Sequence, residues 1–247
     1  MKGQRVLVVG ATSSIARAAA VRFALEGASV YLAARDAEEV DRIARDIEIR
    51  SGARVEWCVF RTEDHASHAP FVANVSSRMG GLDLAFVALG TLGDQRRAET
   101  DFSHAEEMLE GNLTGVVSLL TPIANYFEAQ KRGAIVVIGS VAGDRGRQGN
   151  YIYAAAKAGL HTFLQGLRAR LFRSGVRVVT VKPGFVDTKM IFGRPGVFLA
   201  ASPDQVAADI LSGLKKGRDI IYTPFFWSPV MLILRHIPER LFKRLTV

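Results

Sequence analysis

Short runs of Val, Ile and Leu alternate along the chain with longer segments in which apolar residues recur every three or four positions. Nearly continuous apolar runs are typical of strands covered on both faces, and the wider spacing is typical of amphipathic helices. Strands are predicted at residues 5–9, 29–33, 54–60, 84–88, 134–139, 177–182 and 219–222. Helices are predicted at residues 14–26, 37–51, 66–79, 102–130, 151–173 and 203–216.

This alternation of strands and helices predicts an α/β fold. We expect a single-domain, Rossmann-like doubly wound fold, with a parallel sheet of about seven strands flanked by helices on both faces. The chain has 247 residues and no repeat, low-complexity tract or linker, so residues 1–247 are expected to form one domain. The helix over 203–216 has a well-marked start, because Ser202 can cap it and Gln205 completes a capping box.

Two segments fall outside this alternation. The loop 189–201 is rich in apolar residues, whereas most loops are polar, so we expect it to cover a substrate site. Residues 223–247 form an apolar tail with interleaved Arg and Lys. A helix of that composition can lie in a membrane interface, cover a hydrophobic pocket or pack in an oligomer, and the sequence leaves all three open.

The composition narrows the classes of function. Apolar residues make up 49% of the chain, enough for a sizeable core, and the net charge of +8 favours anionic partners such as nucleotides, phosphorylated lipids or membrane surfaces. The basic residues form no run, so nucleic-acid binding is not predicted. Cys58 is the only cysteine, which excludes an internal disulfide, and no metal site is predicted because no His/Cys cluster has ligand spacing.

The apolar segments also bear on the compartment. The first of them, Val6–Val9, is too short for a signal peptide, and no stretch reaches the roughly 18 apolar residues of a membrane span. We expect a cytoplasmic protein, peripheral at the inner membrane surface if the tail docks there.

The turn between the first strand and the first helix is suited to binding a dinucleotide. Gly10 allows a sharp turn after the strand, and the helix that follows directs its amide groups and the positive end of its dipole at the turn. This arrangement binds the pyrophosphate of NAD(P). The residues expected to line it are Gly10, Thr12, Ser13, Ser14 and Ile15.

The end of the second strand bears on the choice between the two dinucleotides. An acidic residue there would bind the ribose 2′-hydroxyl of NAD, but Ala34 occupies the expected position. Arg35 follows and can pair with the 2′-phosphate of NADP. NADP(H) is therefore favoured, and Asp36 is close enough to leave NAD(H) open.

Three residues have side chains of the types that hydride transfer to a carbonyl requires. Ser140 follows the strand 134–139, and Tyr153 and Lys157 lie four positions apart on one face of a predicted helix. Reduction of a carbonyl builds negative charge on its oxygen, which requires a proton donor and a hydroxyl that holds the oxygen in place. A free Tyr has a pKa of about 10, and a neighbouring ammonium lowers it toward neutral pH. We therefore predict Tyr153 as the acid/base, with its pKa lowered by Lys157, and Ser140 as the residue that orients the substrate oxygen.

The glycine turn and the Ser…Tyr-x-x-x-Lys order together resemble the short-chain dehydrogenase/reductase family, over roughly residues 4–222. The resemblance implies that Asn112 is a fourth catalytic residue, which helps to hold a proton-relay water. Asn112 and Gly115 are poor helix formers, so a local kink is expected there. Homodimers or homotetramers are also implied. The further cofactor contacts that the resemblance implies are Gly90, Tyr153, Lys157, Pro183, Gly184, Val186 and Thr188.

The chain departs from the family pattern at two motifs. In the glycine turn, Val9 replaces the usual Thr, and Ser14 and Ala16 replace the second and third glycines. After the fourth strand, Val87–Gly90 replaces the usual Asn-Asn-Ala-Gly. Small residues still permit close approach of the cofactor, so these changes indicate a divergent subfamily.

The loop between Ser140 and Tyr153 bears on the substrate. Arg145 and Arg147 lie there, beside the expected substrate mouth, and can bind an anionic group. This loop, the variant glycine turn and the apolar-basic tail resemble those of the decaprenylphosphoryl-2-keto-ribose reductases. That resemblance implies a lipid-linked substrate, a keto-sugar on a polyprenyl phosphate.

Two alternatives stay open beside this reading. One is a reductase of small-molecule ketones, other sugars or acyl thioesters. The other is a non-catalytic dinucleotide-binding sensor, although such sensors commonly lose the Tyr or the Lys that this chain retains.

Overall fold

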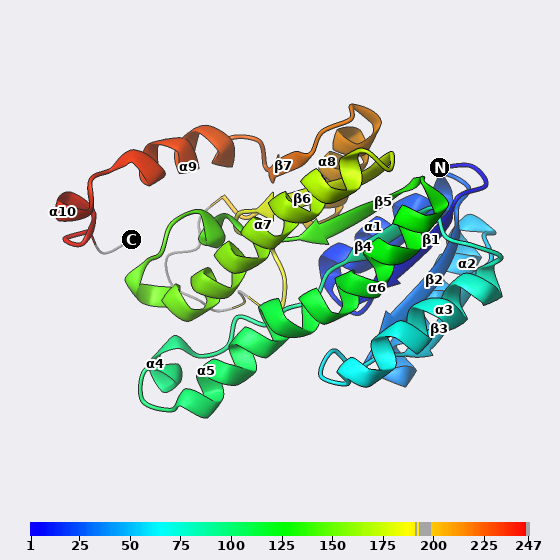
Figure 1. Cartoon of the computed structure of the whole chain (residues 1–247), viewed down its shortest axis with the longest axis horizontal. Helices are drawn as coiled ribbons and strands as arrows, with labels where there is room; N and C mark the ends of the chain where they lie inside the picture. Colours follow the sequence, from blue (N-terminus) through cyan, green and yellow to red (C-terminus); the bar gives the residue numbers. More distant parts are fainter. Residues whose placement is uncertain (191, 193–198, 246–247) are drawn as a thin grey trace.

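The computed structural model describes residues 1–190, 192 and 199–245. Its strands form one parallel sheet with the order β3-β2-β1-β4-β5-β6-β7 (Figure 1). The strands are β1 (Arg5–Val9), β2 (Ser29–Ala34), β3 (Val55–Val59), β4 (Leu84–Val87), β5 (Gly133–Ile138), β6 (Val176–Pro183) and β7 (Ile220–Thr223). The two ends of each strand lie within one residue of the predicted bounds. The predicted fold class is confirmed.

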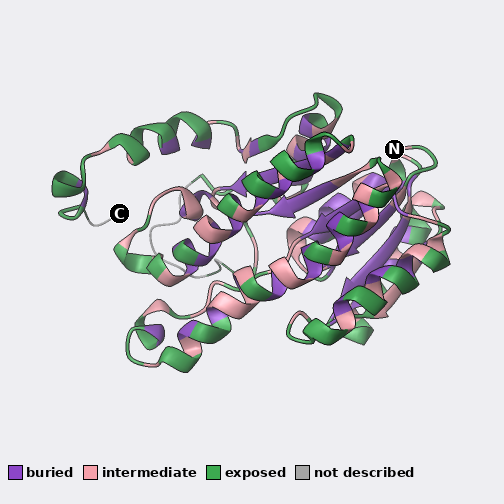
Figure 2. Ribbon diagram, viewed as in Figure 1, coloured by how far each residue is buried: buried purple, intermediate pink, exposed green. Residues whose placement is uncertain are grey.

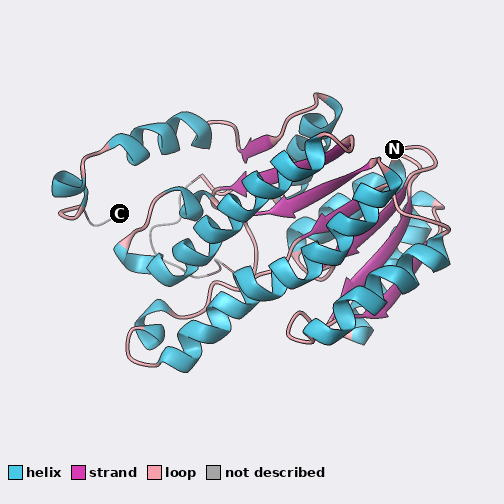
Figure 3. Cartoon of the chain, in the orientation of Figure 1, coloured by secondary structure: helices cyan, strands magenta, loops and turns pink. Residues whose placement is uncertain are grey.

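Helices cover both faces of the sheet (Figure 3). On one face lie α1 (Ser14–Leu25), α2 (Ala37–Ser51) and α8 (Pro203–Lys215). On the other lie α3 (His68–Met79), α6 (Gly115–Gln130) and α7 (Tyr151–Phe172). The remaining α-helices of the described chain are α4 (Gln95–Ala98), α5 (Phe102–Leu109), α9 (Trp227–His236) and α10 (Glu239–Phe242).

The core divides into two layers because successive strand residues point to opposite faces of the sheet. Val6 and Val8 of β1 join the layer under α1, α2 and α8, whereas Leu7 and Val9 join the layer under α3, α6 and α7. Figure 2 shows the result, with buried strands between helices whose outer faces are exposed. This double burial explains why the strand sequences are apolar throughout.

The long helix predicted over 102–130 is interrupted. It consists of α5, a π-helical segment η2 (Glu110–Thr114) and α6. The interruption falls at Asn112, where the poor helix formers predicted a kink. The short helices α4, α9 and α10 were not predicted as separate elements.

The predicted capping box at the start of α8 is half correct. Ser202 Oγ accepts a hydrogen bond from the Gln205 amide at 3.1 Å. The Gln205 side chain does not return to Ser202, because its Nε2 donates to Asp209 Oδ1 at 2.9 Å instead.

The order of the strands reverses between β1 and β4. From β1 the sheet continues to β2 and β3 on one side, and from β4 it continues to β5, β6 and β7 on the other. Ligands of such sheets bind beyond the carboxyl ends of the strands where the order reverses. Within the described residues, every helix falls short of the length and apolarity that crossing a bilayer requires.

Candidate active site

The residues singled out in the sequence gather at this end of the sheet. Gly10 follows β1, Arg35 follows β2, Gly90 follows the β4 region, and Ser140 follows β5. Tyr153 and Lys157 approach from the first two turns of α7. The parallel sheet therefore brings together residues that lie more than a hundred positions apart.

The turn after β1 is tightly packed against the backbone of the neighbouring strand. Gly10 has φ +79°, and a Cβ there would lie 2.4 Å from the Ala88 carbonyl oxygen, so the turn requires glycine. Ser13 caps α1, because its Oγ accepts a hydrogen bond from the Ala16 amide at 3.2 Å. The start of a twelve-residue helix thus faces the crevice, as a pyrophosphate site requires.

Arg35 and Asp36 differ in whether their side chains already have hydrogen-bond or ion-pair partners in the described chain. The Arg35 side chain is exposed, and no hydrogen bond or ion pair joins it to another residue of the described chain. Asp36 caps α2, where its Oδ1 accepts a hydrogen bond from the Glu39 amide at 3.0 Å. Arg35 is therefore available to a ligand at the end of β2, while one oxygen of Asp36 is already used.

Tyr153 is almost completely buried beside Ser140. It is 8% exposed and packs with Ala98, Ala105 and Met108. Burial raises the pKa of Tyr153, and a hydrogen bond with Ser140 acts in the opposite direction. The sequence predicted a pKa lowered by Lys157, and that prediction is wrong for the protein atoms alone, because desolvation of the phenolate dominates.

Lys157 lies one helical turn beyond Tyr153 and is 2% exposed. Its Nζ donates hydrogen bonds to the Leu89 carbonyl at 3.2 Å and the Ile138 carbonyl at 3.3 Å. It lies 5.8 Å from the centroid of the Tyr153 ring. Burial lowers the pKa of Lys157 to about 8, since the ammonium loses its hydration and gains only neutral partners.

Asn112 lies in the π-helical segment and is fully buried. Its Nδ2 donates to the Thr91 carbonyl at 2.7 Å and the Met108 carbonyl at 2.8 Å. Its Oδ1 is buried without a hydrogen-bond partner. A Cβ on Gly90 would lie 2.4 Å from that oxygen and 3.0 Å from Lys157 Nζ, so Gly90 leaves these two polar atoms facing one space.

The segment after β6 closes the far side of the crevice. Pro183 and Val186 are buried, and Val186 forms a parallel bridge with Ala201. A Cβ on Gly184 would lie 1.8 Å from Trp227 Nε1, so glycine is required where the tail packs on this segment. Thr188 is half-buried. The predicted substrate loop 189–201 lies largely outside the described residues, which omit 191 and 193–198.

The two predicted substrate arginines have different surroundings. Arg145 forms an ion pair with Glu239 at 2.6 Å and lies over the Phe242 ring at 4.2 Å. The structure therefore gives Arg145 a contact with the tail, and its predicted role in binding the substrate stays a prediction. Arg147 has its Nε buried without a hydrogen-bond partner, and burial lowers its pKa.

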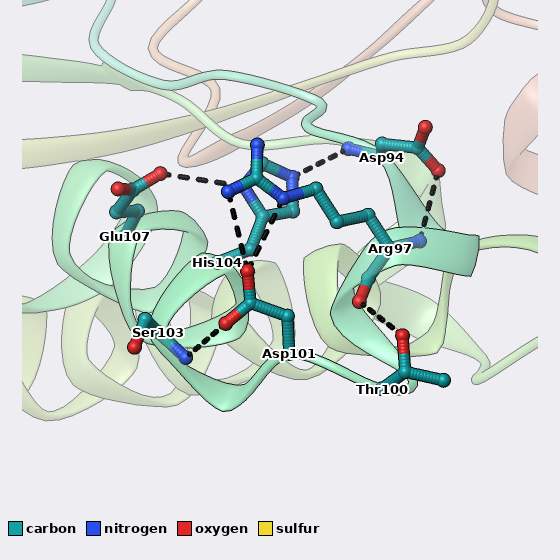
Figure 4. A network of polar contacts seen from close by, with 7 residues as sticks. All are labelled: Asp94, Arg97, Thr100, Asp101, Ser103, His104 and Glu107. Carbon is teal, nitrogen blue, oxygen red and sulfur yellow. Dashed lines mark hydrogen bonds and ion pairs between the residues drawn. The ribbon is translucent and has the colours of Figure 1, made fainter.

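Two short helices form a polar network next to the site (Figure 4). Asp94 caps α4 by accepting a hydrogen bond from the Arg97 amide at 3.2 Å. The Arg97 guanidinium pairs with Asp101, the cap of α5, at 3.2 Å. His104 Nε2 accepts a hydrogen bond from the Asp94 amide at 3.0 Å, which ties α5 to the start of α4.

This network supports the first turn of α7. Gln95 Oε1 accepts a hydrogen bond from the Ile152 amide at 3.1 Å, directly before Tyr153. Ala98 of α4 and Met108 of α5 pack against Tyr153 itself. The α4–α5 pair therefore contributes to holding Tyr153 and the first turn of α7 in place.

Sequence reasoning missed Gln95, which nothing in its surroundings marks, and a buried polar cluster beneath Ser140. The cluster consists of Asp144, His161, Lys182 and Tyr222. One signal was present, because Lys182 is a charged residue at the end of the predicted strand 177–182, which is rich in valine.

Comparison with known proteins reveals relatives over nearly the whole chain. The family model for short chain dehydrogenases matches residues 4–193. An uncharacterized oxidoreductase of Mycobacterium tuberculosis is 37% identical over 240 residues, covering 97% of this chain and 96% of that protein. An uncharacterized oxidoreductase of Streptomyces coelicolor is 36% identical over 245 residues, covering 98% of this chain and 96% of that protein.

Solved structures share the fold. Levodione reductase superposes with a TM-score of 0.83 at 24% identity, covering 90% of this chain and 96% of that one. Actinorhodin polyketide ketoreductase, solved with NADPH, superposes with a TM-score of 0.81 at 24% identity, covering 90% of this chain and 97% of that one.

Proposed function

The chain belongs to the short-chain dehydrogenase family, and from that premise we propose that its reaction is carried out by Asn112, Ser140, Tyr153 and Lys157. It is an oxidoreductase that acts on a CH–OH group with a nicotinamide dinucleotide. We propose that residues 1–247 form one domain for this purpose. The observation that carries the proposal is the burial of Tyr153 next to Ser140 and Lys157 at the carboxyl end of β5.

The crevice fits a dinucleotide. Gly10 and Gly90 stand where a Cβ would meet backbone or polar side-chain atoms, and the unpartnered Oδ1 of Asn112 faces the same space as Lys157 Nζ. The residues proposed to hold the cofactor are Gly10, Thr12, Ser13, Ser14, Ile15, Arg35, Gly90, Tyr153, Lys157, Pro183, Gly184, Val186 and Thr188. When bound, the nicotinamide supplies or accepts hydride.

We propose that side chains of the protein carry out the proton transfer. Burial keeps the pKa of Tyr153 high, so the phenol is protonated at neutral pH and can donate its proton to the substrate oxygen. Ser140, which is hydrogen-bonded to Tyr153, is placed to hold the same oxygen. We propose that Lys157 and Asn112 together bind a water in the space that they share. This water would join the unpartnered Asn112 Oδ1 to the Lys157 ammonium.

We propose NADP(H) as the preferred cofactor. Arg35 is exposed at the end of β2 and makes no hydrogen bond or ion pair within the described chain, so its guanidinium is available to a 2′-phosphate. Asp36, the acid next to Arg35, could bind a 2′-hydroxyl instead, but one of its oxygens already caps α2, which supports the preference for NADP(H).

For the substrate we propose a keto-sugar carried on a polyprenyl phosphate. Arg147 supports an anionic group beside the site, because its Nε is buried without a partner. The tail supports a lipid, since Leu232 and Ile233 of α9 are 58% and 67% exposed and basic residues follow them in the tail. A reductase of other ketones, sugars or acyl thioesters would not need the tail to meet lipid.

Substitution Tyr153→Phe tests the enzymatic proposal. We expect the rate of NADPH oxidation with a small diketone as probe substrate to fall by about 10²- to 10⁴-fold, because the proton donor is lost. NADPH binding, followed by fluorescence, should persist. Tyr151→Phe is the matched control, because Tyr151 is 45% exposed and has no lysine four positions later, and it should keep wild-type turnover. Equal turnover in Tyr153→Phe and wild type would assign the proton transfer to a different acid, and the absence of turnover in both would favour a sensor.

A further inference from the structure

The His161 imidazole is wedged against the loop that carries Ser140. A Cβ on Gly139 would lie 2.4 Å from His161 Nε2, and a Cβ on Gly143 would lie 2.7 Å from His161 Cε1. The ring is 5% exposed. Glycines on both sides of Ser140 therefore leave room for this ring and for little else.

His161 also makes a polar contact with Ser140 itself. Its Nε2 accepts a hydrogen bond from the Ser140 backbone amide at 3.4 Å. Since Nε2 is the acceptor, the proton of the neutral ring is on Nδ1. That nitrogen makes no hydrogen bond of good geometry, but it lies 3.5 Å from Asp144 Oδ1, so attraction between its N–H group and the carboxylate favours the tautomer that the contact with Ser140 requires.

The Asp144 carboxylate is held in turn by side chains of two strands. Lys182 Nζ of β6 lies 2.5 Å from Asp144 Oδ1, and the Tyr222 hydroxyl of β7 donates to Oδ2 at 2.6 Å. The side chains of Asp144 and Lys182 are 3% and 6% exposed. The carboxylate is thus held ionised in the interior by one ammonium and one phenol.

From these contacts we propose that His161 is a positioning residue, which the Asp144–Lys182–Tyr222 cluster holds in the Nδ1-protonated tautomer so that it fixes the backbone of Ser140. The inference rests on the proposed function, because it acts through Ser140. The hydroxyl of Ser140 accepts a hydrogen bond from the Ala142 amide at 3.1 Å and also bonds Tyr153. A displaced Ser140 backbone would carry that hydroxyl away from the substrate oxygen.

The charges around His161 fit this role. Lys157 and Lys182 face the ring with positive charge, and Asp144 faces it with negative charge. Burial is the largest influence and lowers the pKa of His161, so the ring is neutral at physiological pH. A protonated ring would have no lone pair for the Ser140 amide.

A kinetic comparison of two variants tests the proposal. His161→Leu removes the acceptor, whereas the side-chain oxygen of His161→Gln can accept from the same amide. With the diketone probe and NADPH, we expect kcat to fall about 10- to 100-fold in His161→Leu while the KM for NADPH stays within about twofold. Most of the kcat should return in His161→Gln. Gln165→Leu, on the exposed face of α7, is the control and should keep wild-type kcat.

A double-mutant cycle distinguishes positioning from general loosening of the fold. In a Ser140→Ala background, His161→Leu should lower kcat less than about threefold further, because the hydroxyl that it positions is already absent. Equal losses in the two backgrounds would overturn the proposal.

A measurement without turnover separates this proposal from the proposed function. Nitrogen-15 NMR of the histidine rings in the full chain should place the His161 proton on Nδ1, and hydrogen exchange of the Ser140 amide should accelerate in His161→Leu but not in His161→Gln. A wild-type protein that shows this tautomer but reduces no probe would count against the proposed function and leave the positioning role intact. A proton on Nε2 in an active protein would overturn the positioning role alone.

Discussion

Tyr153 and Lys157 are both buried where their charged forms are disfavoured. Burial raises the pKa of the phenol and lowers that of the ammonium to about 8. The protein atoms alone therefore hold Tyr153 protonated, which is the form that a carbonyl reduction consumes. In the described chain, the partners of Lys157 Nζ are carbonyl oxygens, so a ligand that carries negative charge or hydroxyl oxygens would stabilise its charged form.

At the scale of single residues, the preference for NADP(H) over NAD(H) depends on Arg35. Replacing it with Ala should weaken NADPH binding about 10- to 100-fold and leave NADH binding within about twofold, because a charged hydrogen bond to the 2′-phosphate is lost. Fluorescence titration with each dinucleotide measures both affinities. Arg42→Ala, an exposed arginine of α2, should change neither. Tight NADH binding that ignores Arg35→Ala would make NAD(H) the cofactor and leave the fold unaffected.

Helix α7 is the element that organises the site. Tyr153, Lys157 and His161 are spaced by four residues, so they share one face of the helix, turned toward the sheet and the Ser140 loop. One helix thereby carries the proposed proton donor, the ammonium and the proposed positioning imidazole. Its first turn has no side-chain cap of its own, and the Gln95 contact with the Ile152 amide takes that place.

The Gln95 contact gives a prediction for this element. Gln95→Leu should lower the free energy of unfolding by about 1 kcal/mol and accelerate hydrogen exchange of the Ile152 amide, because that amide loses its acceptor. Denaturant titration and exchange NMR measure the two effects. Glu99→Ala removes the other partner of the Gln95 side chain and should cost less than about 0.5 kcal/mol. Comparable effects from both variants would mean that the Ile152 contact has no special role.

At the scale of the whole molecule, the tail packs beside the candidate site on one face and exposes apolar side chains on the other. Trp227 and Met231 on the inner face of α9 pack with Val141, the residue after Ser140, and Glu239 of α10 pairs with Arg145. The outer face of α9 stays exposed, at the same end of the molecule as the carboxyl ends of β5 and β6 (Figure 1). This placement supports the proposed lipid-linked substrate, which would be reached from a membrane surface.

Vesicle binding tests this arrangement. The chain should sediment with vesicles that contain phosphatidylglycerol and not with pure phosphatidylcholine, and raised salt should weaken the binding, because the tail combines apolar and basic residues. The double substitution Leu232→Ser and Ile233→Ser should reduce binding at least about tenfold. Ile49→Ser, which alters an 86% exposed residue on α2, is the control and should have no effect. Unchanged vesicle binding in the double variant would remove the tail from the proposal.

The features that could be predicted from the sequence are those whose pattern lies within one short segment of the chain. The sheet was predictable because buried parallel strands are apolar on both faces, and the spacing of Tyr153 and Lys157 expresses a single helical turn. The helices α4 and α10 have four residues each, too few to show a period. The pairing of Arg145 with Glu239 joins residues 94 positions apart, so the arginine looked available to a substrate. The cluster around Asp144 draws on four elements and has no spacing of its own.

The π-helical segment makes chain length itself a determinant of the site. Each residue of an α-helix advances the chain by about 100° around the axis, and a π turn holds one residue more than an α turn. The π turn accommodates its extra residue without rotating α5 relative to α6, so deleting one residue from Glu110–Thr114 would restore an α-helical ladder with the two flanking helices still aligned. The widened turn that lets Asn112 Nδ2 reach the Thr91 and Met108 carbonyls would be lost, whereas the contact between Gln95 and the Ile152 amide would persist. A single deletion here would therefore remove the Asn112 contacts and leave the α4–α5 support of Tyr153 in place.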